Sequence, residues 1–112
     1  MPIANCFITS KCQSSPDHSE SLIDVWAQES KVSPEHMTVN IIASNEQHGN
    51  EYNVMANLIL PSMWSRNDIS LLQIGLANAL SRHFNVPLQS VHVTTNIVNS
   101  GMVVEAGKEI KW

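Results

Sequence analysis

The chain has 112 residues, which corresponds to one domain at roughly 100–200 residues per domain. Apolar residues make up 43% and exclude intrinsic disorder, whereas charged residues make up only 14%, against about 25% in a usual soluble domain. A surface so poor in charge predicts that part of it is covered, most simply by other copies of the chain. The net charge of −4 argues against a nucleic-acid binder or an anionic-membrane binder, because both need a basic surface.

Nothing in the sequence predicts export or a membrane span. No apolar run approaches the roughly 20 residues that cross a bilayer. Residues 1–12 lack a basic start, a long apolar stretch and a small-residue cleavage site, so we expect no signal peptide. Cys6 and Cys12 are the only cysteines, and two thiols without an export signal favour a reduced, cytoplasmic protein.

The first half of the chain predicts a strand, a helix and a second strand. Residues 3–9 form an apolar run with β-branched and aromatic side chains, typical of a strand. Ser15-Pro16-Asp17 has the residues of a helix start, and apolar side chains at helical spacing continue to about residue 30. After Pro34 the apolar residues alternate with polar ones over 37–44, which predicts the second strand. The polar stretch 45–53 is a linker.

The second half repeats this order. Residues 54–60 predict a strand that ends at Pro61, and Ser65 or Asn67 caps a helix that runs to about Phe84. Residues 90–98 predict the last strand of the repeat.

The chain is therefore one domain with two pseudo-repeats and a tail. The repeats are residues 2–44 and 54–98, and residues 101–112 form a small C-terminal β-hairpin. Two architectures are compatible with a chain that contains two successive β-α-β units. Each unit could join parallel strands by a crossover helix, or the chain could adopt the antiparallel, ferredoxin-like arrangement. The nearly equal halves favour the duplicated β-α-β unit. The second architecture often binds RNA, which the acidic composition and the scarcity of sheet aromatics argue against.

Pro2 is the most informative single residue. Initiator methionine is normally removed before a small residue such as proline, and removal would leave a secondary amine at the start of a core strand. Burial and a nearby cation both lower the pKa of an amine. An amine that is neutral near pH 7 can act as a general base for moving a proton next to a carbonyl.

The sequence resembles the tautomerase superfamily, which includes 4-oxalocrotonate tautomerase, macrophage migration inhibitory factor and 5-carboxymethyl-2-hydroxymuconate isomerase. The matching segments are PIAN at 2–5, Arg66-Asn67-Asp68, Ser81-Arg82, Pro87-Leu88, Ser90-Val91-His92-Val93 and the glycine-containing C-terminal hairpin. The resemblance implies an α/β fold, in which two β-α-β repeats form a four-stranded mixed sheet with two helices on one face and a C-terminal hairpin. It also implies a homotrimer whose sheets form a barrel-like core.

The resemblance further implies an enzyme that needs no cofactor and no metal. Pro2 would be the general base for enol-keto proton transfer on a small keto acid that carries a carboxylate. The residues implied to bind that substrate are Arg66, His92, Lys31, Val103 and Thr94. Decarboxylation or hydration with the same proline is a related possibility. The alternative function is a non-catalytic trimeric member that binds or scaffolds.

The remaining chemistry-bearing residues are expected to have structural roles. His18, His36, His48 and His83 lack the spacing of metal ligands and are expected at the surface. Cys6 is expected to be a buried apolar residue rather than a nucleophile. Trp26 is expected in the core, Trp64 in a loop where it could cap a pocket or a subunit contact, and Trp112 as an anchor of the C-terminus.

Overall fold

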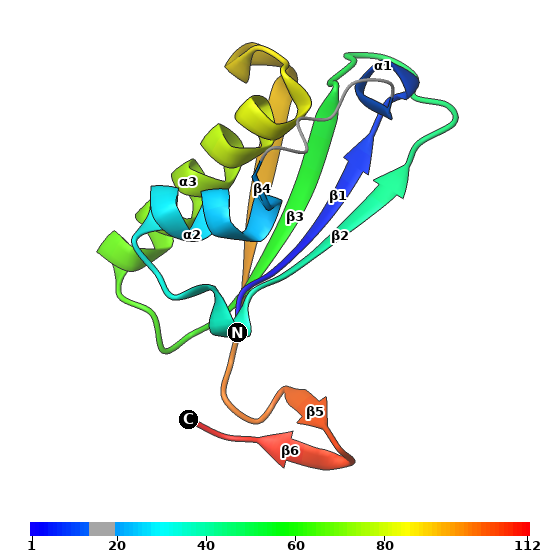
Figure 1. Ribbon diagram of the computed structural model, residues 1–112. Coiled ribbons are helices and arrows are strands. Elements are labelled where there is room, and N and C mark those ends of the chain that lie inside the picture. Colours follow the sequence, from blue (N-terminus) through cyan, green and yellow to red (C-terminus); the bar gives the residue numbers. More distant parts are fainter. Residues whose placement is uncertain (14–19) are drawn as a thin grey trace.

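A four-stranded sheet carries helices on one of its faces in the computed structural model, which describes residues 1–13 and 20–112 (Figure 1). The elements are β1 (Ile3–Ile8), α1 (Ser10–Gln13), α2 (Leu22–Ser30), the short 3-10 helix η1 (Pro34–His36), β2 (Thr38–Ala43), β3 (Val54–Pro61), α3 (Arg66–Phe84), the 3-10 helix η2 (Leu88–Ser90), β4 (Val91–Val98), β5 (Val103–Glu105) and β6 (Lys108–Ile110). No helix in the described part of the chain has the length and apolar character that crossing a membrane requires.

The sheet has the order β2-β1-β3-β4. β1 pairs with β2 in parallel and β3 pairs with β4 in parallel, while β1 and β3 are antiparallel neighbours at the centre. Each half of the chain is therefore a parallel β-α-β unit, as the equal halves predicted, and the ferredoxin-like alternative is wrong. β5 and β6 pair as an antiparallel hairpin outside this sheet, below its lower end in Figure 1.

The core lies between the sheet and the two long helices. Alternate residues of β1 and β3 point toward the helices, as expected for strands with one buried face. Trp26 of α2 is fully buried, which confirms its expected place in the core. The buried apolar side chains that meet here are Ala4, Cys6, Ile8, Val25, Val54, Ala56, Leu58, Leu60, Leu72, Leu76, Ala79, Leu80 and Phe84.

The observed helix starts refine two predictions. The Ser65 hydroxyl accepts a hydrogen bond from the backbone N–H of Asp68 at 3.1 Å, so Ser65 rather than Asn67 is the N-cap of α3. The start predicted at Ser15-Pro16-Asp17 lies outside the described residues, and the described helix α2 begins at Leu22. The short helix α1 was not predicted.

Both long helices end in the same way. Lys31 follows α2 and Asn85 follows α3, and each adopts the left-handed conformation, with φ of 59° and 54°. The residue after each cap donates its backbone N–H to a carbonyl of the helix that has just ended. Val32, for example, donates to the Ala27 carbonyl at 3.2 Å. Glycine is the usual residue at such a cap because its backbone adopts positive φ without strain.

Candidate functional site

A cavity of about 420 Å³ lies beside the start of the chain. Five segments meet around it: the start of β1, the turn between α2 and η1, η1 itself, the loop between β3 and α3, and the first turn of α3. The lining residues are Met1, Pro2, Lys31, Val32, Ser33, His36, Met63, Trp64 and Asp68. Its volume lies in the range of small-molecule sites, which is about 300–1,000 Å³.

Pro2 forms part of the wall of this cavity and is itself fully buried. Its carbonyl accepts a hydrogen bond from the backbone N–H of Thr38 at 3.0 Å, which joins the start of β1 to the start of β2. Met1 precedes Pro2, so the Pro2 nitrogen is an amide in this form of the chain and has no basic lone pair. The terminal amine belongs to Met1, where burial lowers its pKa and the nearby Glu105 carboxylate partly opposes this shift.

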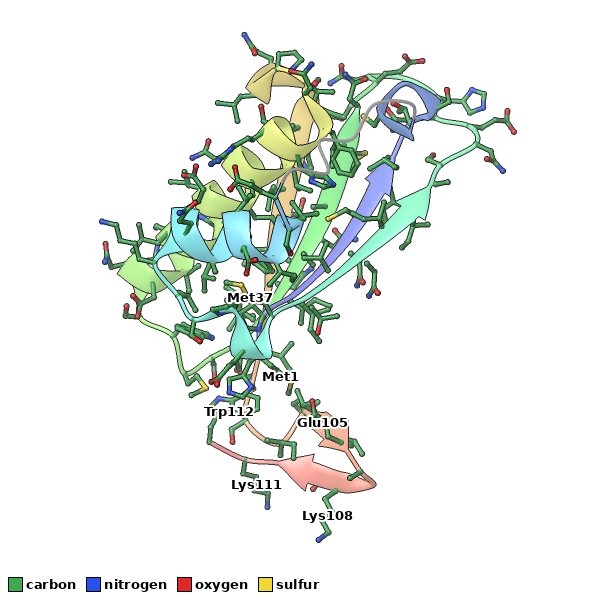
Figure 2. The ribbon with its side chains drawn as sticks, viewed as in Figure 1. Met1, Met37, Glu105, Lys108, Lys111 and Trp112 are labelled. Carbon is green, nitrogen blue, oxygen red and sulfur yellow. The ribbon has the colours of Figure 1, made fainter. Side chains whose placement is uncertain are left out.

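Met1 lies at the junction between the body and the hairpin. Figure 2 shows Met1, Glu105 and Trp112 gathered there, while the side chains of Lys108 and Lys111 point away from the body. The Trp112 indole N–H donates to the Ser62 hydroxyl at 2.9 Å. This bond ties the C-terminus to the loop after β3, within the same chain.

Lys31 is the one lysine or arginine among the described residues that line this cavity. Lys31 is one of the residues that the family resemblance implied for substrate binding, and Val32 follows it in the chain. Both residues line the cavity, because the left-handed cap at Lys31 turns the chain there. The structure therefore brings Lys31 and Pro2 together, as the predicted site requires.

Trp64 lines the same cavity and has an unusual hydrogen-bond status. Its indole nitrogen is buried, and no hydrogen-bond acceptor reaches it among residues 1–13 and 20–112. The other two tryptophans are paired: the Trp26 N–H donates to the Leu72 carbonyl at 3.0 Å, and the Trp112 N–H donates to Ser62. Buried N–H groups in native proteins are nearly always paired, so this one calls for an explanation.

Two further cavities share Met1 with the first. One of about 350 Å³ is lined by Met1, His36, Pro61, Met63, Ile110 and Trp112. The other, of about 190 Å³, lies against the hairpin, and Val103 lines it together with Met1. Val103 therefore borders the start of the chain but does not line the Pro2 cavity.

Arg66 is exposed as the first residue of α3 and does not line the Pro2 cavity. Two neighbours in sequence, Trp64 and Asp68, do so instead. Trp64 had been expected in a loop where it could cap a pocket or a subunit contact, whereas Asp68, Met63, Ser33 and His36 were not predicted for the site. Asp68 belongs to the Arg66-Asn67-Asp68 segment that carries the family resemblance. That segment could therefore have identified Asp68 as a candidate site residue.

His92 and Thr94 lie elsewhere within one chain. They line a separate cavity of about 230 Å³ with Phe7, Ser44, Gln47, Met55, Ala56 and Asn57. In the strand register Ile3, at the start of β1, pairs with Ile59 of β3, and Ile59 pairs with Asn96 of β4. His92 precedes Asn96 by four residues, so it lies about 13 Å from the level of Ile3 along β4, at ~3.3 Å per residue. The His92 imidazole and the Thr94 hydroxyl are 3.0 Å apart, and the Tyr52 ring centroid lies 5.0 Å from the imidazole.

Cys6 has the character of a core residue. Its side chain is fully buried, and burial raises the pKa of its thiol to about 12. The thiolate that a nucleophile needs is therefore disfavoured at neutral pH. Within the described residues, no group of three or more His, Cys, Asp and Glu side chains is arranged to hold a metal ion.

No family model and no curated protein matches this chain in sequence. Solved structures do match it in fold. A fused 4-OT, solved as a symmetric trimer, has a TM-score of 0.73 at 12% identity and covers 96% of this chain and 94% of that chain. A member of the cis-3-chloroacrylic acid dehalogenase family has a TM-score of 0.72 at 12% identity, covering 96% and 82%. Macrophage migration inhibitory factor from Oncomelania hupensis has a TM-score of 0.70 at 15% identity, covering 98% and 82%. The resemblance to this superfamily is thus confirmed at the level of the fold.

Proposed function

We propose that this chain, which has the tautomerase-superfamily fold, moves a proton between the enol and keto forms of a small keto acid. In the proposed mechanism Met1 is removed, and the freed Pro2 amine is the general base. It takes a proton from the enol hydroxyl or the α-carbon and returns it elsewhere on the conjugated substrate. The observation that carries the proposal is that Pro2 and Lys31 line one cavity of suitable size.

The surroundings of Pro2 suit a base that is neutral near pH 7. Pro2 is fully buried where Met1 precedes it, and the amine of Met1 itself has a pKa lowered by burial. Burial of a Pro2 amine would disfavour its protonated form in the same way, and the positive charge of Lys31 would add to this effect. A base with a pKa near the working pH transfers protons efficiently in both directions.

Lys31 is proposed to bind the substrate carboxylate. It is the only lysine or arginine among the residues that line the cavity, and an ammonium group bonds a carboxylate oxygen by a charge-assisted hydrogen bond. Val32 and Met63 give the same cavity an apolar wall for the rest of the substrate.

The remaining predicted residues require a neighbouring subunit. The fused 4-OT of similar fold is a trimer, and we propose the same assembly for this chain. The helices leave one sheet face uncovered (Figure 1), and Phe7 and Ile42 on that face are each 39% exposed. In such an assembly His92, Thr94 and Arg66 would approach the Pro2 cavity of another subunit, and Val103 would extend its apolar wall. Sedimentation equilibrium tests this part directly: a monomer mass would contradict it.

The central test is the rate of enol-to-keto conversion of phenylenolpyruvate or 2-hydroxymuconate. It is measured on protein whose mass shows that Met1 is absent, beside the Pro2→Ala variant and beside protein that retains Met1. We expect activity only in the first sample. Equal rates in the processed protein and Pro2→Ala would overturn the proposed mechanism.

A second candidate is a non-catalytic trimer that binds or scaffolds. The observation in its favour is that Arg66 and His92 do not line the Pro2 cavity within one chain. If mature protein retains Met1 and all three samples are inactive, this function replaces the first.

A further inference from the structure

We propose that a row of polar side chains across the uncovered sheet face makes copies of this chain associate as a closed ring rather than as an open-ended stack. The row consists of Asn40, Asn5, Asn57 and Thr94, and we name it the asparagine row. Its partner is the same row on a second copy of the chain. This inference rests on the assembly that the proposed function includes, but its test does not depend on catalysis.

The first step of the argument is the geometry of the row. Asn5 of β1 pairs with Asn40 of β2 and with Asn57 of β3, and Asn57 in turn pairs with Thr94 of β4. Paired residues of neighbouring strands point to the same face, so these side chains cross the sheet at one level. The Asn40 side-chain amide donates to the Asn5 side-chain oxygen at 2.8 Å. Ala4, which precedes Asn5, is buried on the helix side, so the row lies on the face that the helices leave uncovered (Figure 1).

The second step is the surroundings of the row. The adjacent row at the end nearest Pro2 has Ile3 and Ile59 on the two central strands. The adjacent row on the other side has Phe7 and Met55 there. None of the residues in these three rows is Asp, Glu, Lys or Arg, so the face does not suit a nucleic acid or a strongly charged protein. Side-chain amides both donate and accept hydrogen bonds, so the asparagine row is complementary to a copy of itself.

The third step is the position of the row in an assembly. In a ring, rotational symmetry places every copy of a residue at the same height along the axis, so the asparagine rows of neighbouring copies meet. In an open-ended stack each copy is displaced along the axis, and a displacement of two residues amounts to ~7 Å. The amides of Asn5 and Asn57 would then face apolar side chains and lose their partners. Unpaired buried amides cost free energy, so the row favours the ring.

Apolar side chains alone would not make this distinction. A face of that kind packs against itself in many ways, because apolar contacts have no direction. A single buried asparagine selects the register and the number of helices in a coiled coil, at some cost in stability. We assign the same function to the asparagine row on this sheet. The row would thereby also fix where His92 and Thr94 lie relative to the Pro2 cavity of the neighbouring copy.

The test is the mass distribution of the double variant Asn5→Leu/Asn57→Leu, since leucine has nearly the shape of asparagine and keeps the face apolar. The matched control is Asn67→Leu, which makes the same change at an exposed position of α3, outside the sheet. Native mass spectrometry and sedimentation velocity are carried out over a hundredfold range of protein concentration. We expect a single trimer mass for the wild type and the control. The double variant should give a mixture that includes species larger than the trimer, which increase with concentration.

Three results would overturn the inference. They are a single trimer mass for the double variant, its dissociation into folded monomers, and a monomeric wild-type protein. Dissociation counts against the inference because it would show that the amides supply affinity rather than select the ring. Where circular dichroism shows that the double variant does not fold, Asn57→Leu alone takes its place, with the same expected and contrary results.

A second readout uses the wild-type protein alone. The side-chain amide protons of Asn57 should exchange slowly with deuterated water, because the assembly buries them against the next copy. Those of Asn67 should exchange freely at the surface of α3. Free exchange at Asn57 would also overturn the inference.

The outcomes separate this inference from the proposed function. Mixed masses of the double variant, together with a wild type that has no tautomerase activity, would leave the asparagine row standing and remove the catalytic role of Pro2. Tautomerase activity of the wild type, together with a single trimer mass of the double variant, would do the reverse.

Discussion

Replacing Gly75 by alanine should weaken the contact between α2 and α3. A Cβ atom at this position would lie 3.0 Å from the backbone nitrogen of Ser30 and 3.1 Å from the Ser30 Cβ. Ordinary contacts between nonbonded heavy atoms need about 3.5–4.0 Å, so one helix must move away from the other by roughly 0.5 Å. The atoms in the way belong largely to the backbone of α2, which cannot rotate aside as a flexible side chain can.

Two opposing effects set the size of the change. Alanine in a helix interior is more favourable than glycine by about 1 kcal/mol, whereas overpacking a tight contact costs about 1–3 kcal/mol. We therefore expect the free energy of unfolding to fall by about 1 kcal/mol, and the melting temperature to fall by roughly 4 °C for a domain of this size. Because Ser30 directly precedes Lys31, the displaced helix should also weaken the binding of a carboxylate ligand.

Thermal unfolding followed by circular dichroism at one fixed protein concentration measures the first effect, with Ile74→Ala as the control. Ile74 lies next to Gly75 on the exposed side of α3, and its replacement should change stability by less than about 0.5 kcal/mol. A melting temperature of Gly75→Ala equal to or above that of the wild type would refute the reasoning, since it would show that α2 yields at no cost.

Three further predictions follow from the described residues. Between pH 9 and 12 the folded chain keeps the Cys6 proton that the unfolded chain releases, so the free energy of unfolding should fall as pH rises, by up to ~1.4 kcal/mol per pH unit. Urea unfolding at several pH values should show this fall, and Cys6→Ala should flatten it. Lys31→Gln should raise the KM for a keto acid about tenfold, whereas Lys108→Gln, whose side chain points away from Met1, should not; equal effects would remove Lys31 from the site. Ser65→Ala should cost about 1 kcal/mol of unfolding free energy, measured with urea, and an unchanged value would show that the cap contributes nothing.

The strands and long helices were predictable because their periodicities are regular. Polar and apolar residues alternate over residues 38–41 of β2 and 91–94 of β4, and the leucines of α3 recur at helical spacing around Leu72 and Leu76. The parallel pairing within each half followed from the near-equal halves rather than from periodicity. The short helix α1 carries too few residues to show a period.

The candidate site was predictable only in part. Pro2 and Lys31 were identified from the sequence, and the structure brings them to one cavity. His92 could be assigned to a strand face but not to an end of the sheet, because that depends on strand register. Trp64 was expected in a loop where it could cap a pocket, and it lines the same cavity as Pro2 and Lys31.

The repetition of the β-α-β unit sets a limit on stoichiometry. The two helix ends, with their left-handed caps at Lys31 and Asn85, are equivalent corners of the molecule. Only the first corner can meet a chain terminus, since β3 is joined by a peptide bond to the segment before it. A reaction that needs a terminal amine can therefore occur once per chain. A duplication that fused two β-α-β units into one chain would leave one terminal amine for every two units, while it preserved the sheet. In the proposed mechanism the second corner therefore needs no cation, and it has the uncharged Asn85 at the position equivalent to Lys31.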